Sequence, residues 1–409
     1  MNSYSFVTKI LKEVKKVMSN VKNIQVEATI ADTVSIDEDP IISLRYLFLS
    51  KEEITLKEFI EKLEGVYPGL GIPVLYGTLS ILANKNVFYI GGRGTGKTRI
   101  INCIPEIEGT YSSKWDTFTL GELDALCSSF PNQVDDNKFL GNIGVHDKHF
   151  VFKVEDFSTL SEYHREIFLT VCSKISSDGN YRHITSITPN LNIENCKLTM
   201  LIAIQPKLYS LLCNRYTQWE TMSYDRFTKF LVLNPLRRGR TVDTPFVPTL
   251  PKKIPPSATL QHSIDLNKLI TLFRGHVSEG RALLYARDYA IAMARFLGKT
   301  EVEQEDVDLF FKLFSPYLES FSKLQTRESL ESPITVSSGH MELLTEIAKY
   351  IEGISKQQLS QNLMVTERHI ERCTKLLLEK EIIKEENGKY HLSKNLKQFF
   401  EWYSNTFSV

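Results

Sequence analysis

The chain has 409 residues, which is more than one hydrophobic core usually serves, so two to four domains are expected. Hydrophobic residues make up 42% and charged residues 24%, an ordinary globular composition. Lys plus Arg equals Asp plus Glu at 49 each, so any attraction to nucleic acid has to come from local patches and not from the total charge.

The sequence has no apolar run long enough to span a membrane, and its N-terminus lacks a signal-peptide core and cleavage site. Its six cysteines are scattered without a C-x-x-C pair, which is typical of reduced core residues and not of a zinc site or a disulfide framework. We therefore expect a cytoplasmic protein with no membrane partner.

Residues 1–55 are expected to form a small N-terminal region. Apolar residues at helical spacing with lysines between them predict a basic helix over 1–22, and one or two strands follow in 23–50. Such a helix could touch DNA or an acidic membrane surface, but a docking helix with a solvated lysine face is the commoner case.

A glycine-rich stretch stands between an apolar strand predicted at 86–90 and the start of a helix, and it matches the pattern G-x-x-x-x-G-K-[ST]. In a loop of this kind the backbone N–H groups turn inward toward phosphates, and a side chain at Gly91, Gly94 or Gly96 would obstruct that approach. The candidate nucleotide-binding residues are Gly91, Gly92, Arg93, Gly94, Thr95, Gly96, Lys97, Thr98 and Arg99.

Two side chains of this loop have specific expected roles. Lys97 would reach the β- and γ-phosphates of a nucleotide, and Thr98 would offer its hydroxyl to Mg²⁺. The N-terminus of the following helix adds partial positive charge. The expected cofactors are therefore ATP and Mg²⁺.

An apolar strand from His149 ends in two carboxylates, Glu155 and Asp156. A phosphate-loop ATPase needs such a pair, one acid to hold Mg²⁺ through water and one to orient or deprotonate the attacking water. We assign Glu155 to the first role and Asp156 to the second. Lys153 lies within this strand, where an unpaired charge would be costly.

The next elements extend this pattern along the chain. A helix is predicted over 158–174, and the turn signal after it predicts a β-hairpin that includes Arg182, a candidate DNA contact. The apolar strand 198–204 then ends in the polar Gln205. Residues 236–256 are proline-rich and basic, which predicts a connector without regular structure.

The last part of the chain, 336–409, is expected to form a separate unit. Its pattern predicts a helix over 341–351, a second capped by Ser355, a third capped by Thr366, and a hairpin over 382–392 with an Asn-Gly turn. This unit carries ten basic and ten acidic residues, so its net charge is zero.

This order of motifs resembles an AAA+ ATPase, and within that family the clade of minichromosome-maintenance helicases and MoxR-type ATPases. Three passages carry the resemblance: Glu155 to Ile167 with its following hairpin, Asp225 to Leu233, and Ser278 to Leu284 with the helix after it. The resemblance implies that Gln205 is the first sensor, that Arg226 is an arginine finger acting on a neighbouring subunit, and that Arg281 is the second sensor.

The resemblance also implies the fold class: an α/β phosphate-loop core with a parallel sheet and helices on both faces over 56–245, and a helical lid over 246–330. The unit 336–409 resembles a winged helix-turn-helix domain. By that resemblance Arg368, His369, Arg372 and Lys375 would face a DNA major groove, and Lys389 would lie in the wing. Acidic neighbours such as Glu367 and Glu371 also leave a protein contact open.

The function expected from these resemblances is an ATP-hydrolysing motor that acts on DNA, of a helicase-like, initiator or loader kind in replication. It would work as a ring, with a hexamer expected. Two alternatives stay open: a MoxR-like ATPase that remodels protein partners and uses the winged helix as an adaptor, and an ATP-binding switch with weak hydrolysis, which the Glu-Asp order at 155 and 156 permits.

Overall fold

The structure is a computed structural model that describes residues 55–115, 119–128, 143–183, 191–215, 225–234, 246–250, 254–326 and 335–407. The helix and strands expected within 1–50 lie outside the described residues, as do parts of the connector expected over 236–256.

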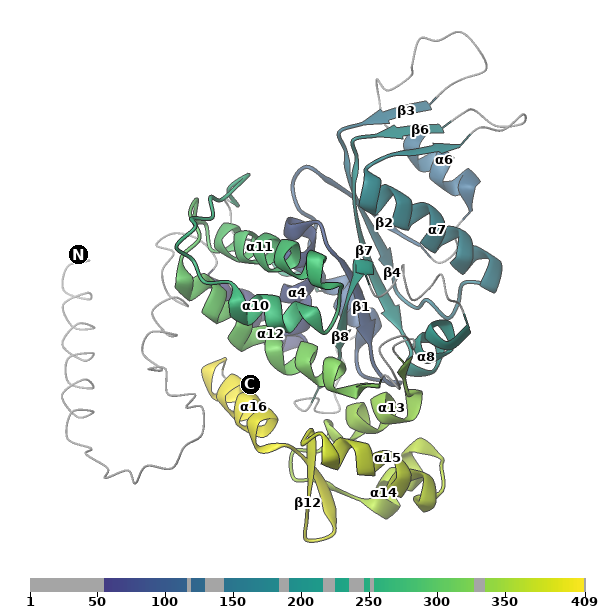
Figure 1. Cartoon of the computed structure of the whole chain (residues 1–409), viewed down its shortest axis with the longest axis vertical. Helices are drawn as coiled ribbons and strands as arrows, with labels where there is room; N and C mark the ends of the chain where they lie inside the picture. The colour runs from purple at the N-terminus through teal and green to yellow at the C-terminus, as the bar shows by residue number, and fades with distance from the viewer. Residues whose placement is uncertain are drawn as a thin grey trace, which may run out of the picture. The chain divides into compact units, whose positions relative to one another are not determined.

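The chain has an α/β architecture around a central sheet of five parallel strands (Figure 1). The strand order is β2-β4-β7-β1-β8. Their bounds are β1 Asn86–Ile90, β2 Thr110–Lys114, β4 His149–Val154, β7 Lys197–Ile204 and β8 Phe227–Leu231. Because β7 lies between β1 and β4, the glycine-rich loop after β1 and the carboxylates after β4 are separated by one strand.

Helices cover both faces of this sheet, as the side chains of β1 show. Tyr89 donates its hydroxyl to the carbonyl of Pro73 at 3.0 Å, toward helix α4, whereas the neighbouring Phe88 packs edge-on against Tyr209 of helix α8. Successive residues of a strand point to opposite faces, so all five residues of β1 are buried. This explains why the strand reads as a continuous apolar run.

The helices of the α/β part are α3 Leu56–Val66, α4 Gly71–Ala83, α5 Lys97–Cys103, α6 Leu120–Ser128, α7 Glu162–Asp178 and α8 Pro206–Arg215. The sequence predicted α7 to begin at 158, but its N-cap is Ser161, whose side chain accepts the N–H of His164 at 3.2 Å. Residues 158–160 instead form the turn that follows the strand-end carboxylates.

A second sheet of three strands, order β3-β6-β5, adjoins the first. Its strands are β3 Ile143–His146, β5 Tyr181–His183 and β6 Leu191–Glu194. Strands β5 and β6 pair antiparallel, which confirms the predicted hairpin containing Arg182. Strand β3 leads directly into β4 and β6 into β7, and the two pairs β3–β6 and β4–β7 are both parallel. The second sheet therefore continues the first beyond the amino ends of β4 and β7.

The next segment is helical, as predicted, with α10 Asn267–Arg274, α11 Glu279–Phe296 and α12 Gln304–Leu324. The sequence predicted the last helix to end before Pro316, but α12 runs through this proline. Burial explains the continuation, because Tyr317, Phe321 and Leu324 beyond the proline are each at most 1% exposed. A two-stranded ladder, β9 Gln325–Thr326 with β10 Thr335–Val336, follows.

The C-terminal unit contains α13 Ser338–Ile347, β11 Ile354–Ser355, α14 Lys356–Leu363, α15 Glu367–Glu379, β12 Ile383–Glu386, β13 Lys389–Leu392 and α16 Lys394–Thr406. The predicted caps are confirmed, because Ser355 and Thr366 accept N–H groups of α14 and α15. The predicted Asn-Gly turn is also confirmed, with φ values of 51° and 70° at Asn387 and Gly388. Helix α16 is an addition that the sequence patterns did not predict.

Candidate functional site

The glycine-rich loop joins β1 to α5, as the sequence predicted. Gly94 and Gly96 have φ values of 74° and 93°, a region that side-chain-bearing residues rarely adopt. A Cβ on Gly91 would lie 2.6 Å from the hydroxyl oxygen of Thr95. The glycines therefore allow a tightly closed loop that is well suited to surround an anion with backbone N–H groups.

Lys97 folds back over this loop. Its Nζ donates to the carbonyl oxygens of Gly91 and Gly92 at 2.7 and 2.8 Å. Burial lowers the pKa of Lys97 to about 8, and the carboxylate of Asp156 opposes that shift. Among the described residues no ion pair involves Lys97. A desolvated ammonium group without a paired carboxylate favours the binding of an anion.

The ends of β4 and β7 lie at the same edge of the sheet as the loop. Strands β1, β4 and β7 are parallel, so their carboxyl ends lie at the same end of the sheet and the residues that follow them come close together. The Thr98 hydroxyl donates to the backbone carbonyl of Glu155 at 3.4 Å, which places α5 beside the end of β4. Gln205 follows β7 directly, between the other two strand ends.

The two carboxylates at the end of β4, Glu155 and Asp156, already have partners within the protein. Glu155 pairs with Lys114 at 3.4 Å, a lysine that belongs to none of the sequence motifs. Asp156 accepts the backbone N–H of Ser158 at 2.9 Å and its hydroxyl at 2.6 Å. These contacts hold both carboxylates at the edge but also compete with any ligand for their oxygen atoms.

Lys153 has the partner that its position in a buried strand requires. Its Nζ donates to the carbonyl of Ile104, just beyond the end of α5, at 2.7 Å. Burial lowers its pKa to about 8. The lysine therefore ties the end of the loop helix to β4, which is a structural role.

The donor set at this edge fits a magnesium ion and a nucleotide phosphate. Mg²⁺ prefers oxygen ligands, and the Thr98 hydroxyl and the Glu155 carboxylate are hard oxygen groups on adjacent segments. The closed glycine loop and the ammonium group of Lys97 suit the phosphates. The guanidinium of Arg99, a further candidate for nucleotide binding, lies 5.4 Å from the centre of the Tyr67 ring.

Arg226 and Arg281 lie together at the opposite edge of the sheet. Phe227 pairs with Asn86, the first residue of β1, so the backbone of Arg226 is about 17 Å from the loop end of β1 at the usual rise per residue of a strand. Arg226 donates to the carbonyl of Ser173 at 2.9 Å, and Arg281 donates to the carbonyl of Asp225 at 2.8 Å. Burial and the charge of Arg281 lower the pKa of Arg226.

The candidate DNA contacts differ in their surroundings. Arg182 is exposed on β5, and Arg368, Arg372, Lys375 and Lys389 are exposed in the C-terminal unit.

His369 is half-buried and lies close to α13, because a Cβ on Gly339 would meet its Nε2 at 3.2 Å. Glu367 and Glu371 both pair with Lys356, at 3.4 and 2.7 Å, so these carboxylates are partly neutralised.

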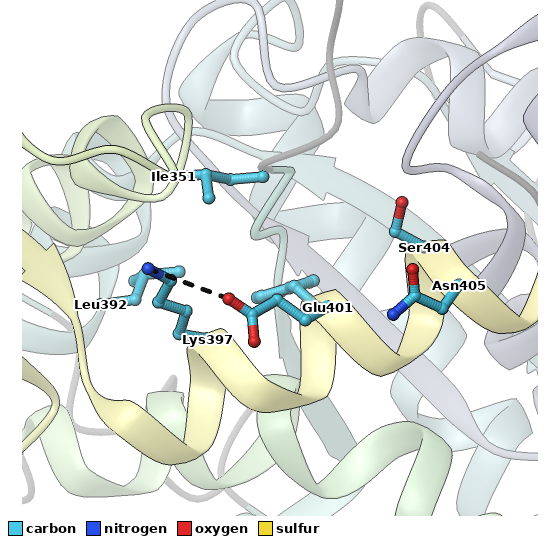
Figure 2. Close-up of a pocket in the computed structure, with 7 residues that line it drawn as sticks. Ile351, Leu392, Lys397, Glu401, Ser404 and Asn405 are labelled. Carbon is cyan, nitrogen blue, oxygen red and sulfur yellow. Dashed lines mark ion pairs between the residues drawn. The ribbon is translucent and has the colours of Figure 1, made fainter.

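A cavity of about 260 Å³ lies beside α16 in the C-terminal unit (Figure 2). Its lining includes the Lys397–Glu401 ion pair at 3.8 Å and the polar side chains of Ser404 and Asn405. None of its lining residues belongs to the glycine loop or to the strand ends. It is smaller than usual ligand pockets, and we assign the candidate site to the sheet edge on chemical grounds.

The structure also brings the C-terminal unit to the glycine loop, which the sequence did not indicate. The Nζ of Lys349, in the turn after α13, donates to the carbonyl of Arg93 at 3.4 Å. These two residues are 256 positions apart, and no local pattern in the sequence links them.

The sequence matches no protein-family model and no curated protein. Within the part of the chain that the structure describes, no helix has the length and apolar character needed to cross a membrane. The fold and the site geometry are thus the grounds on which a function can be proposed.

Proposed function

We propose that this protein is an AAA+ ATPase that couples ATP binding and hydrolysis to action on DNA. The observation that carries the proposal is the meeting of three features at one sheet edge: the glycine loop with Lys97, the carboxylates Glu155 and Asp156, and Gln205. A strand order that places β7 between β1 and β4 supports it, since it leaves a polar residue between the loop and the carboxylates.

The roles of the residues follow from this arrangement. Lys97 and the loop N–H groups bind the phosphates, while Thr98 and Glu155 hold Mg²⁺, which offsets negative charge on the phosphates. Asp156 orients or deprotonates the attacking water, and Gln205 hydrogen-bonds that water or the γ-phosphate. For this role Asp156 has to give up at least one contact with Ser158.

Arg226 and Arg281 act on the nucleotide of a neighbouring subunit in this proposal. They lie at the sheet edge away from their own glycine loop, so they cannot contact a nucleotide bound there without leaving their partners. Leu283 and Leu284, next to Arg281 on α11, are 53% and 44% exposed, which suits contact with a second copy of the chain. A ring, with a hexamer expected, satisfies both features.

Action on DNA rests on the arrangement of the C-terminal unit. Helices α14 and α15 followed by the β12–β13 hairpin are compatible with a winged helix-turn-helix, and α15 presents Arg368, Arg372 and Lys375 on exposed positions. Arg182 on the β5–β6 hairpin offers a second contact.

The ATPase rate with and without DNA tests the proposal. We expect a measurable rate that DNA raises several-fold, and a rate at background for Lys97→Ala, because the loop then lacks its cation. Lys62→Ala is the matched control, since Lys62 is an exposed lysine on α3. A Lys97→Ala protein as active as the Lys62→Ala protein would refute the proposed site, and an unchanged rate with DNA would refute the DNA-dependent part.

A salt titration of DNA binding tests the C-terminal contacts separately. Loss of Arg368 and Arg372 to alanine should weaken DNA binding and flatten the dependence of its logarithm on salt, because each lost phosphate contact removes about one unit of slope. If both measures stay unchanged, Arg368 and Arg372 do not contact DNA, and the alternative of a MoxR-like remodelling ATPase is favoured.

A switch that binds ATP and hydrolyses it weakly is a second candidate. It is favoured by the contacts of Glu155 with Lys114 and of Asp156 with Ser158, which compete with Mg²⁺ and with the attacking water. Tight ATP binding with no turnover, with or without DNA, would select this candidate.

A further inference from the structure

The end of α13 lies against the glycine loop. Lys349 donates to the carbonyl of Arg93 at 3.4 Å, and the hydroxyl oxygen of Thr345 lies 3.1 Å from the position of a Cβ on Gly92. Gly92 and Arg93 precede the residues with positive φ, so the C-terminal unit contacts the first half of the loop. A side chain on Gly92 would push against Thr345.

A second contact reaches the segment on the other side of the loop. The Tyr403 hydroxyl of α16 hydrogen-bonds the Glu64 carboxylate, which also accepts the N–H groups of Gly69 and Gly71 at 2.5 and 2.6 Å. Leu70, between these glycines, lies 3.0 Å from the position of a Cβ on Gly96. The C-terminal unit therefore contacts both flanks of the loop, directly at one and through residues 64–71 at the other.

Lys349 is held close to the loop, but its ammonium group does not use all of its hydrogen-bond donors in these contacts. Its Nζ pairs with Glu346 at 2.5 Å and donates to Arg93, which uses two of its three donors. Glu346 is shared, because it also accepts from the Asn362 amide at 2.9 Å. The side chain of Lys349 is 24% exposed, so it can turn toward a ligand on the loop.

The two ammonium groups of Lys97 and Lys349 interact unfavourably. Lys97 donates to the carbonyl oxygens of Gly91 and Gly92, and Lys349 donates to the next carbonyl oxygen, that of Arg93, so two like charges lie on consecutive carbonyl groups of one loop. Among the described residues neither Glu346 nor Asp156 forms an ion pair that bridges both lysines. Bound phosphates would supply negative charge to both and remove the repulsion.

We propose that Lys349 of the C-terminal unit is a second cation for the phosphates of the nucleotide bound to the glycine loop of the same chain. The inference rests on the proposed function, since it requires that the loop bind a nucleoside triphosphate. If Lys349 has this role, the C-terminal unit forms part of the nucleotide site and does not act separately from it.

Coupling between the two parts follows from this geometry. A nucleotide held by both Lys97 and Lys349 binds more tightly when α13 is docked on the loop, so by linkage it also holds α13 in place. Lys349 contacts Arg93 in the first half of the loop. A nucleoside triphosphate carries one phosphate more than a diphosphate and therefore offers Lys349 more negative charge. ATP should therefore order the end of α13 more than ADP.

Calorimetry on the full chain tests the proposal with a non-hydrolysable ATP analogue and with ADP. We expect Lys349→Ala to weaken binding of the ATP analogue about ten-fold and binding of ADP less, as for loss of one charge-assisted hydrogen bond. Lys349→Arg should keep most of the affinity. Lys394→Ala is the matched control, because Lys394 is an exposed lysine of the same unit, and its affinity should equal that of the wild type.

Hydrogen–deuterium exchange provides a readout that a purely structural lysine would not change. The ATP analogue should slow exchange over residues 338–350 in the wild type but not in Lys349→Ala. If Lys349→Ala is poorly folded by circular dichroism, Lys349→Gln takes its place, because it keeps most of the side-chain volume.

The outcomes separate this inference from the proposed function. Failure of the wild type to bind either nucleotide, or equal binding by Lys97→Ala, would overturn both. If Lys97→Ala loses binding while Lys349→Ala binds the ATP analogue as the wild type does, the inference is wrong and the proposed nucleotide site stands. An equal weakening of ATP-analogue and ADP binding, without a change in exchange over 338–350, also overturns the coupling.

Discussion

The hydroxyl of Tyr403 in the last helix, α16, hydrogen-bonds the carboxylate of Glu64 in α3. Glu64 is 3% exposed, and burial raises its pKa. The same carboxylate accepts two backbone N–H groups of the segment that leads into α4. One buried acid thus fixes both a turn beside the glycine loop and the packing of the last helix.

Removing the hydroxyl of Tyr403 should weaken the packing of α16 against α3 and so lower the stability of the protein. We expect Tyr403→Phe to lower the free energy of unfolding by about 1–2 kcal/mol, because a buried carboxylate loses one hydrogen bond and keeps two. Urea unfolding followed by circular dichroism measures the change. Tyr350→Phe is the control, since the Tyr350 hydroxyl accepts from Asn362 at a more exposed site. Equal effects of the two substitutions would argue against a special role for the buried pair.

Nucleotide affinity should fall at alkaline pH. The pKa of Lys97 is about 8 in the free protein, and bound phosphates favour its charged form, so binding takes up a proton above that pH. The affinity for the ATP analogue should be constant near pH 7 and then fall as pH rises through 8, by up to about ten-fold per unit.

The control for this pH dependence is Lys97→Arg, whose guanidinium stays charged throughout the range. Its affinity, even if lower, should change much less between pH 7 and 9.5. A wild-type affinity that stays constant over the same range would contradict the assignment of Lys97 as the phosphate cation.

The positions of Arg226 and Arg281 predict that hydrolysis sites are shared between subunits. Arg226→Ala alone should reduce turnover about 100-fold or more, as should Lys97→Ala, because each lacks one half of the site. When the two proteins are mixed in equal amounts, about a quarter of the interfaces regain both halves, so activity should return in part.

Mass measurement by light scattering accompanies this mixing experiment, since exchange requires association. Restored activity in the mixture supports contributions from two subunits. A mixture as inactive as its components, under conditions in which a mixed assembly forms, would place Arg226 outside the reaction.

Stability should rise between neutral and moderately alkaline pH because of Lys229 in β8. This residue is fully buried, and burial lowers its pKa from 10.5 to about 7, with Cys213 and Asp225 opposing the shift. Between these two values the unfolded chain binds more protons than the folded one, so the free energy of unfolding increases with pH. The adjacent His276 titrates outside this window, since burial lowers its pKa to about 3.

Lys229→Met should reduce this pH dependence, which denaturant unfolding from pH 7 to 9.5 can measure. Lys97 and Lys153, whose pKa values are about 8, contribute in the same direction and will leave part of the slope. Lys323→Met, at an exposed position of α12, serves as the control. A slope that is the same in all three proteins would show that Lys229 is protonated to the same extent in both states.

The sequence by itself determined the features that depend on neighbouring residues. The glycine loop after β1, the carboxylates after β4, the capped helices α14 and α15 and the Asn-Gly hairpin were all predicted, because apolar periodicity, capping residues and turn residues act over a few positions. The end of α12 was wrong by nine residues, since burial of the residues after Pro316 outweighs the local preference of proline.

Only the tertiary structure decided which of these local features meet. The position of β7 between β1 and β4 places Gln205 between the loop and the carboxylates, and the pairing of β8 with β1 places Arg226 at the far edge. The contacts of Lys349 with Arg93 and of Tyr403 with Glu64 join residues more than 250 positions apart. Such contacts arise from the packing of whole elements and leave no periodic trace in the sequence, so the contact of the C-terminal unit with the glycine loop became visible only in the fold.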